Sequence, residues 1–316
     1  MSAHWSQRRE GGSRVAIAVI IAIGRNLGRR CARLLLHPIT LYFFLRRGPE
    51  RRASRAYLRR VLGRPAGILA VLRHMHSYAA TILDRLFLLA GPLSRFDVRV
   101  HGLDQLEAQI AHGRGVLLLG AHIGSFEVLR ALAEARPDIR VSVVMDRQQT
   151  PAMTELLHAL NPAVAEGVID AGQDSATIAM AIRDAALRGE LIGLLADRAR
   201  PREATCDAMF FGAAAQFPVA PYLIASMLDL PSVLCFGLYR GGNRYELHFE
   251  TFAESIRIAR SERAVRLAEW TQRYALRLEF FTRLDPYNWF NFYDFWHHPV
   301  DDRAVAGAPV TGHSAA

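Results

Sequence analysis

Short apolar runs alternate with helical stretches from about residue 97 onward, and this alternation constrains the fold more than any other feature. The runs are short and bounded by turn residues, as buried strands are. The expected strands are residues 115–119, 139–145, 167–170, 191–195, 232–239 and 245–251. The expected helices are residues 126–135, 151–160, 175–187 and 262–284. This order predicts an α/β fold with a mostly parallel central sheet flanked by helices on both faces.

The last two strands are separated only by the turn Gly241-Gly242-Asn243, which predicts a hairpin at an antiparallel edge of the sheet. We expect one catalytic domain over residues 61–300 and a disordered tail over residues 301–316, where the sequence becomes small and polar. The chain has three cysteines with no CxxC spacing. This pattern argues against a disulfide framework and a zinc site, so we expect no metal and a reducing compartment.

Positive charge is concentrated at the amino-terminal end. Residues 1–60 contain 14 arginines and two acids, a net charge of +12, whereas the whole chain carries +9. All 39 basic residues are arginine, which a GC-rich genome explains, but codon bias does not explain the clustering. A basic terminus favours an anionic partner such as phospholipid head groups or an acidic carrier protein. Nucleic acid is not expected, because the arginines alternate with aliphatic runs and no nucleic-acid-binding motif is present.

Two apolar runs lie within this basic region, at residues 15–24 and 34–45. Spanning the hydrocarbon core takes about 20 apolar residues, so neither run suffices alone. We interpret residues 1–60 as a membrane-associated segment whose interfacial helices direct arginines to the head groups. Helices buried against the main domain and a single tilted span are the alternatives. Pro38 should kink any continuous helix through this region.

Three of the expected strands end in polar groups. His122 to Glu127 follow the first strand, Asp146-Arg147 follow the second, and Asp197-Arg198 follow the strand at 191–195. In open α/β sheets, ligands bind at the carboxyl ends of the strands. These three strand ends are therefore the predicted site.

His122 and Glu127 form the sharpest pair. Gly120 and Gly124 allow a tight backbone around His122, and Glu127 falls in the first turn of the next expected helix. If His122 folds back over that turn, Glu127 accepts one ring N–H and the other ring nitrogen faces a substrate. Such a dyad has no protein nucleophile, so it suits direct attack by a hydroxyl of the acceptor. Ser125 lies in no G-x-S-x-G elbow, which argues against a serine hydrolase.

The spacing alone is weak evidence. With 30 acids in 316 residues, 12 histidines give on the order of one His-x4-acid match by chance. The chain has two, and the second, His297/Asp302, lies in the polar tail with no strand before it. Placement therefore favours His122, although a structural histidine that caps the turn stays open.

Five further residues are candidate substrate contacts: Asp197, Arg147, Arg198, Gly124 and Gly212. Arg147 and Arg198 suit a phosphate or the phosphopantetheine of a carrier, against the alternatives of an exposed loop arginine and an ion pair between Asp197 and Arg198. The backbone at Gly124 and Gly212 is predicted to line the site. The aromatic run over residues 287–296 fits a core lid or a membrane-interface belt.

The run LLLGAHIGSFEVLRAL resembles the late lipid A biosynthesis (lauroyl/myristoyl) acyltransferases, part of the His-x4-acid glycerolipid acyltransferase group. The likeness covers most of the chain. It includes Trp5, the Gly-Arg and LLLHPITLYFF stretch near residues 24–44, LRRGPERRASRAYLRRVLG, FFGAAAQFPVAP at 210–221 and PYNWFNFYDFW at 286–296.

The resemblance implies an enzyme at the cytoplasmic face of the bacterial inner membrane, held by an amino-terminal anchor. It implies transfer of an acyl chain from acyl carrier protein or CoA to a hydroxyl of a glycolipid, lysophospholipid or similar lipid acceptor. His122 becomes the general base, Glu127 its orienting partner, and Asp197 part of the second polar site. No cofactor is implied, since acyl-ACP or acyl-CoA is a co-substrate. The partners implied are acyl carrier protein, anionic membrane lipids and the acceptor lipid.

The sequence also departs from that family. Lipid A enzymes often carry an arginine-bearing stretch between the two sites, whereas residues 160–172 contain no arginine. The ending YNWFNFYDFW also lacks the basic residues that usually follow the family's tryptophan. The closer likeness is to acyltransferase-like members of aryl-polyene or xanthomonadin-type pigment clusters, so lipid A itself is not assumed as the acceptor.

A catalytically silent membrane-surface scaffold is the alternative function. Contact between the His122 and Glu127 side chains in an open cleft favours the enzyme, and a buried, separated pair favours the scaffold.

Overall fold

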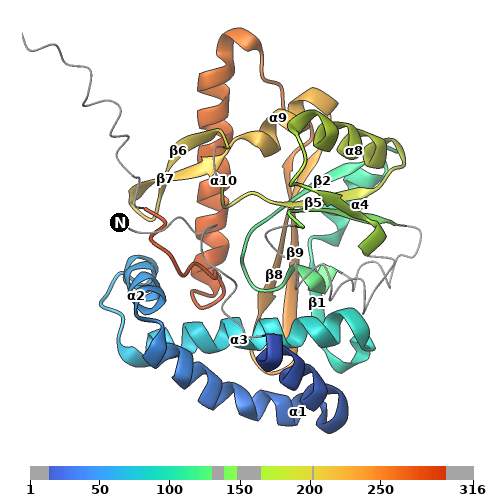
Figure 1. The fold of residues 1–316 in the computed structure, drawn as a ribbon. Coiled ribbons are helices and arrows are strands. Elements are labelled where there is room, and N and C mark those ends of the chain that lie inside the picture. The colour runs from blue at the N-terminus through green and yellow to red at the C-terminus, as the bar shows by residue number, and fades with distance from the viewer. Residues whose placement is uncertain (1–13, 130–138, 148–164, 201–202, 297–316) are drawn as a thin grey trace, which may run out of the picture.

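The computed structural model describes residues 14–129, 139–147, 165–200 and 203–296 (Figure 1). The helices are α1 (Arg14–Arg46), α2 (Gly48–Leu62), α3 (Ile68–Ala90), α4 (Leu103–Ile110), α8 (Ser175–Leu187), α9 (Ala220–Leu228) and α10 (Arg263–Leu284), with 3-10 turns η2 (Leu93–Arg95), η3 (Phe126–Leu129) and η4 (Arg260–Glu262). The strands are β1 (Asp97–His101), β2 (Val116–Gly120), β3 (Val141–Met145), β4 (Val168–Asp170), β5 (Leu191–Leu195), β6 (Thr205–Phe210), β7 (Ala213–Pro218), β8 (Ser232–Tyr239) and β9 (Arg244–Ala253).

Seven strands form the central sheet in the order β1-β9-β8-β2-β5-β3-β4, and every pairing except that of β8 with β9 is parallel. The predicted mostly parallel α/β sheet and the hairpin are thus confirmed. The hairpin is not the edge, however, because β1 pairs with β9 on its outer side. The sequence of β1, DVRVH, has no apolar run and is largely exposed, so its hydropathy did not identify a strand.

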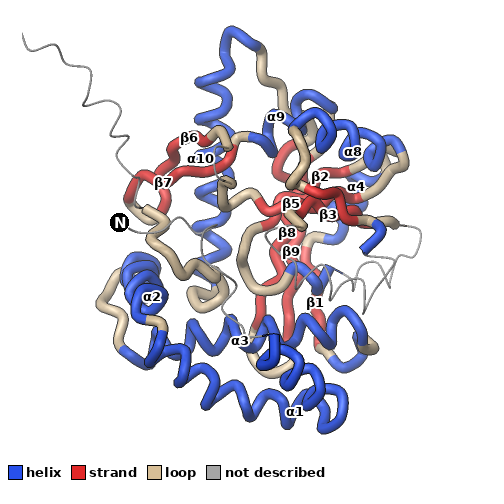
Figure 2. The backbone as a smooth tube through the Cα atoms, viewed as in Figure 1, coloured by secondary structure: helices blue, strands red, loops and turns tan. Residues whose placement is uncertain are grey.

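Both faces of the sheet are covered by helices, as Figure 2 shows. All five residues of β2 are buried, which is why this strand reads as an unbroken apolar run. Leu117 and Leu119 pack in one core cluster with residues of α8 and α10. Val116 and Leu118 pack in a second cluster with residues of α1, α3 and α4. The alternation follows from the period of two along a strand.

The amino-terminal helices lie together along one side of the molecule (Figure 1), where Ala32 and Leu36 of α1 are buried in the second core cluster. Pro38 is not where α1 breaks. The break in α1 lies at Gly28, whose φ of 80° and ψ of 168° are not helical, and Pro38 is inside the helix that follows. Within the part of the chain that the structure describes, no helix is both long and apolar enough to cross a bilayer.

A second, two-stranded sheet, β6 with β7, packs near α10 and was not predicted. Gly212 lies in its turn, exposed, with a φ of 76°. Several predicted features fall outside the described residues, so they stay predictions. They are Trp5, the helix at 151–160, the remainder of the helix at 126–135, His297/Asp302 and the tail at 301–316.

Candidate active site

Close backbone contacts fix the turn that follows β2. The Gly124 N–H donates to the Asn288 carbonyl at 2.8 Å, and the Ser125 N–H donates to the Gly237 carbonyl at 2.8 Å. Gly124 has a φ of 61°, and a Cβ atom there would lie 1.8 Å from the Gly237 oxygen. The left-handed backbone and this contact both exclude a side chain. The turn therefore presents His122 in one place, between β2 and the carboxyl-terminal segment.

Replacing Gly124 by alanine should lower the free energy of unfolding by at least about 2 kcal/mol, because the new Cβ atom must push β8 away as well as adopt a positive φ. Gly212 is the matched control, since its φ is also positive but a Cβ atom would meet no heavy atom within 4 Å. Gly212→Ala should cost about 1 kcal/mol. Urea unfolding followed by circular dichroism measures both, and equal losses would contradict the close approach at Gly124.

His122 and Asp197 meet because β2 and β5 are neighbouring parallel strands. Gly120 and Leu195 are in register, so the chain leaves both strands at the same edge of the sheet. His122 Nδ1 lies 2.8 Å from Asp197 Oδ1, and the His122 backbone N–H donates to Asp197 Oδ2 at 3.1 Å. The same carboxylate thus holds both the ring and the backbone of His122.

Asp197 is fully buried and ionised. Its Oδ2 atom accepts the Trp289 indole N–H at 3.0 Å, and Arg198 Nε lies 3.8 Å away. Burial alone would raise the pKa of this carboxyl. The His122 ring, the Arg198 guanidinium and the Trp289 hydrogen bond outweigh burial and hold the pKa well below its usual range. Asp197 is therefore a fixed negative charge beneath the His122 ring.

His122 is held as a neutral base. Loss of surrounding water and the charges of Arg198 and Arg85 lower its pKa below the ordinary value, against the opposing effect of Asp197. A neutral ring that bonds Asp197 through Nδ1 carries its proton there, an assignment made from the hydrogen bond. The side chain is 34% exposed. Nε2 makes no hydrogen bond with any residue that the structure describes, so its lone pair is free to accept a proton.

Glu127 does not contact the His122 ring in the way that the spacing predicted. Its Oε1 atom lies 2.5 Å from Arg85 Nε of α3, and its Oε2 atom accepts the Ser125 hydroxyl at 2.7 Å. The physical reason is the backbone: η3 begins at Phe126, two residues after the left-handed Gly124, and it carries Glu127 toward α3. Glu127 joins the His122 turn to α3, and Asp197 occupies the position next to the ring. The His122 and Glu127 side chains are thus separated, but the His122 side chain is not buried, so the sequence-based test fits neither the enzyme nor the scaffold.

Sequence reasoning missed Trp289 as a site residue. The aromatic run that contains it is a buried lid, in which Trp289 is fully buried and donates to Asp197. The Trp289 carbonyl in turn bonds His74 Nε2 at 2.9 Å, and His74 Nδ1 lies 2.8 Å from the Ser54 hydroxyl. Burial lowers the pKa of His74 to about 4, so this ring stays neutral and structural. No spacing signal links residues 92 apart in sequence.

The chain matches the family model described as bacterial lipid A biosynthesis acyltransferase over residues 6–298. It belongs to this family. The match includes the His122 turn, Asp197 and the Trp289 lid, and it makes the protein an acyltransferase of the lipid A type. No curated protein matches the sequence. The likeness to pigment-cluster members stays a prediction.

In this acyltransferase, the two arginines that were predicted to contact substrate, Arg147 and Arg198, donate hydrogen bonds to backbone carbonyls of the protein itself. Arg198 donates to the Phe290 carbonyl and lies 5.3 Å from the centre of the Tyr293 ring. Arg147, at the end of β3, donates to the Val168 carbonyl at 3.0 Å. None of the contacts described for Arg147 or Gly212 is with His122. A substrate-binding role therefore stays a prediction for Asp197, Arg147, Arg198, Gly124 and Gly212.

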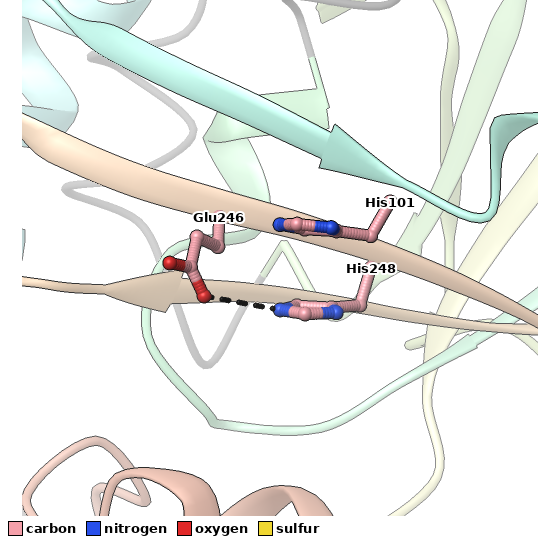
Figure 3. A group of neighbouring side chains, drawn as sticks. All are labelled: His101, Glu246 and His248. Atoms are coloured by element: carbon pink, nitrogen blue, oxygen red, sulfur yellow. Dashed lines mark ion pairs between the residues drawn. The ribbon is translucent and has the colours of Figure 1, made fainter.

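One further group of side chains among the described residues has metal-ligating chemistry: His101, Glu246 and His248 (Figure 3). The two imidazole rings stack with centres 4.6 Å apart, on residues of β1 and β9 that are in register. Glu246 Oε2 lies 3.4 Å from His248 Nε2 and accepts the Arg240 Nε–H at 2.8 Å. A bound cation would have to displace this guanidinium, so we interpret the group as a structural contact at the edge of the acyltransferase sheet.

Proposed function

We propose that this acyltransferase moves a fatty acyl chain from an acyl carrier protein or CoA thioester to a hydroxyl of a glycolipid, lysophospholipid or similar amphipathic acceptor. The observation that carries the proposal is the pair of His122 and Asp197, with Nδ1 bonded to the carboxylate and Nε2 free. This is the arrangement that a general base needs when the attacking group belongs to the substrate.

In the proposed reaction, His122 Nε2 removes the proton from the acceptor hydroxyl while the oxygen attacks the thioester carbonyl. The Asp197 carboxylate stabilises the imidazolium that forms. The tetrahedral intermediate then collapses with cleavage of the C–S bond, and the imidazolium returns the proton to the departing thiolate. The products are an acyl ester and the free thiol of the carrier. Glu127 takes part through the turn, because its ion pair with Arg85 and the hydrogen bond that it accepts from Ser125 hold the backbone on which His122 lies.

We also propose that the enzyme works at the cytoplasmic face of the bacterial inner membrane, with acyl carrier protein, anionic lipids and the lipid acceptor as partners. The support is the exposed surface of α1, where Leu41, Tyr42 and Leu45 face outward beside arginines. Apolar side chains next to arginines are what an interfacial helix presents to a bilayer.

Mass spectrometry of lipid extracts tests the proposal and identifies the acceptor. Cells that express the wild-type chain should contain a lipid heavier by one acyl group, which is absent from cells expressing His122→Ala at the same level. The same lipid profile in both strains would refute acyl transfer by His122 and would favour the scaffold alternative.

The acid limb of the rate profile gives a separate prediction. The base must be neutral, so the transfer rate should be full above the pKa of His122 and fall as the pH drops through it. Because that pKa is lowered by loss of water around the ring and by Arg198, the midpoint should lie below the ordinary value of 6.5. Initial rates with a soluble acyl donor measure the profile, and a midpoint above 6.5 would contradict a neutral His122.

A further inference from the structure

A basic cavity of about 900 Å³ lies away from the contacts of His122, between α1, α3 and the turn that joins β8 to β9. It begins at Gly28, where α1 breaks. No carboxylate of the described residues lines the cavity. Its basic lining consists of four arginines and two histidines: Arg29, Arg30, Arg33, Arg95, His37 and His76. Such a surface attracts anions strongly.

The carboxylate of Asp84 holds two of these arginines in place through ion pairs. Arg29 places Nε and Nη2 each 2.6 Å from the carboxylate of Asp84, and Arg33 Nη1 lies 3.3 Å from the same group. Asp84 is fully buried and also accepts the Tyr245 hydroxyl at 2.9 Å. Two guanidinium groups on one carboxylate leave an excess positive charge, and their side chains are already ordered before a ligand binds. A preorganised donor set loses less entropy on binding.

Arg30 and Arg95 are the free cations of the cavity. Both side chains are exposed, and neither makes a hydrogen bond or ion pair with a side chain or backbone group of the described residues. Guanidinium groups bind phosphate oxygens with two parallel hydrogen bonds. The cavity therefore combines two arginines held in place with two that are available to an entering phosphate.

An apolar stripe continues from the cavity along the same face of α1. Leu34 lines the cavity and is 70% exposed, and Leu41 and Leu45 beyond it are 50% and 65% exposed. With Arg30 and His37, these residues follow spacings of three and four, which place them on one face of a helix. Phosphate-binding groups followed by exposed leucines match the order of head group and acyl chain in a lipid, and a soluble anion would need no such stripe.

We propose that this cavity binds the phosphate of an anionic membrane lipid and so docks α1 on the bilayer surface. The inference rests on the membrane setting of the proposed function and names the chemistry of that partner. The site is separate from the catalytic pair, so docking and transfer can be measured independently.

Vesicle binding by the purified full-length chain tests the docking site. The double variant Arg30→Gln/Arg95→Gln should bind phosphatidylcholine vesicles that contain phosphatidylglycerol about thirtyfold more weakly than the wild type, since each arginine near an anionic surface contributes about 1 kcal/mol. Both residues are exposed, so the thermal midpoint should not change. Co-sedimentation over a range of lipid concentrations gives the affinity.

The matched control is Arg260→Gln/Arg263→Gln, which removes the same charge at the start of α10, on the opposite side of the molecule from α1 (Figure 1). It should weaken binding less than about twofold, because these groups lie far beyond the screening distance of salt. Equal losses in the two double variants would overturn the proposal, since net charge alone would then explain the effect.

Two other outcomes would also overturn it. The first is binding of inorganic phosphate through Arg30 and Arg95 with vesicle binding unchanged in the variant, which assigns the cavity to a soluble anion. The second is loss of binding to an acidic acyl carrier protein with vesicle binding intact. Because vesicle binding needs no turnover, His122→Ala should bind vesicles like the wild type, and failure of acyl transfer leaves this result interpretable.

Discussion

Replacing His122 by alanine is expected to lower acyl transfer by about a thousandfold, because the variant has no group that can take the proton of the attacking hydroxyl. In the structure Nε2 is the one ring nitrogen left without a bond to the described residues, since Nδ1 lies 2.8 Å from Asp197. The loss should fall on kcat rather than on KM, as expected for an interaction made in the transition state. Single-turnover assays with an acyl carrier thioester measure it.

His112→Ala is the control for this variant, because His112 is exposed in the loop before β2 and contacts neither Asp197 nor the His122 turn through its side chain. It should retain the wild-type rate. If His122→Ala keeps more than about a tenth of the wild-type rate, proton removal by His122 is not the source of catalysis.

The centre of the sheet was predictable because β2, β5 and β8 are buried on both faces. The strands at residues 191–195 and 232–239 have the predicted boundaries, and apolar sequence alone marks buried strands of this kind. The elements that were missed are those whose pairing depends on backbone groups rather than on hydropathy. β1 is largely exposed and is held by its ladder with β9, and the two-stranded β6–β7 sheet is held by its own antiparallel ladder.

The residues of the candidate site could be predicted from the sequence, but the partner of the His122 ring could not. The rule that ligands gather at the carboxyl ends of strands brought His122 and Asp197 into one candidate set, and the structure joins them. The partner of the ring was not predictable from spacing, because Glu127 is five residues away and Asp197 is 75 away. The strand order determines which carboxylate lies beside the ring. Because β2 and β5 are neighbours in the sheet, Asp197 is brought next to His122, and this pairing depends on the whole sheet rather than on local sequence.

The second large effect is expected at Asp197. Asp197 Oδ2 accepts two N–H groups, from Trp289 and from the His122 backbone, whereas Oδ1 accepts only the ring. An asparagine at this position should direct its single oxygen to the two donors and its NH₂ group to His122 Nδ1. This hydrogen bond selects the tautomer that carries its proton on Nε2, where the lone pair was needed. Asp197→Asn should therefore lower transfer by roughly 10²–10⁴-fold with the fold intact.

Nitrogen chemical shifts of the His122 ring provide a readout that a merely structural role would not move, since the proton should shift from Nδ1 to Nε2 in Asp197→Asn. Glu127→Gln is the comparison variant: it weakens the contact with Arg85 but leaves the ring bonded to Asp197, so it should lower transfer less than about tenfold. A larger loss in Glu127→Gln than in Asp197→Asn would restore Glu127 as the orienting partner. An unchanged tautomer with a lowered rate would mean that the negative charge of Asp197, and not its control of the proton position, is what His122 requires.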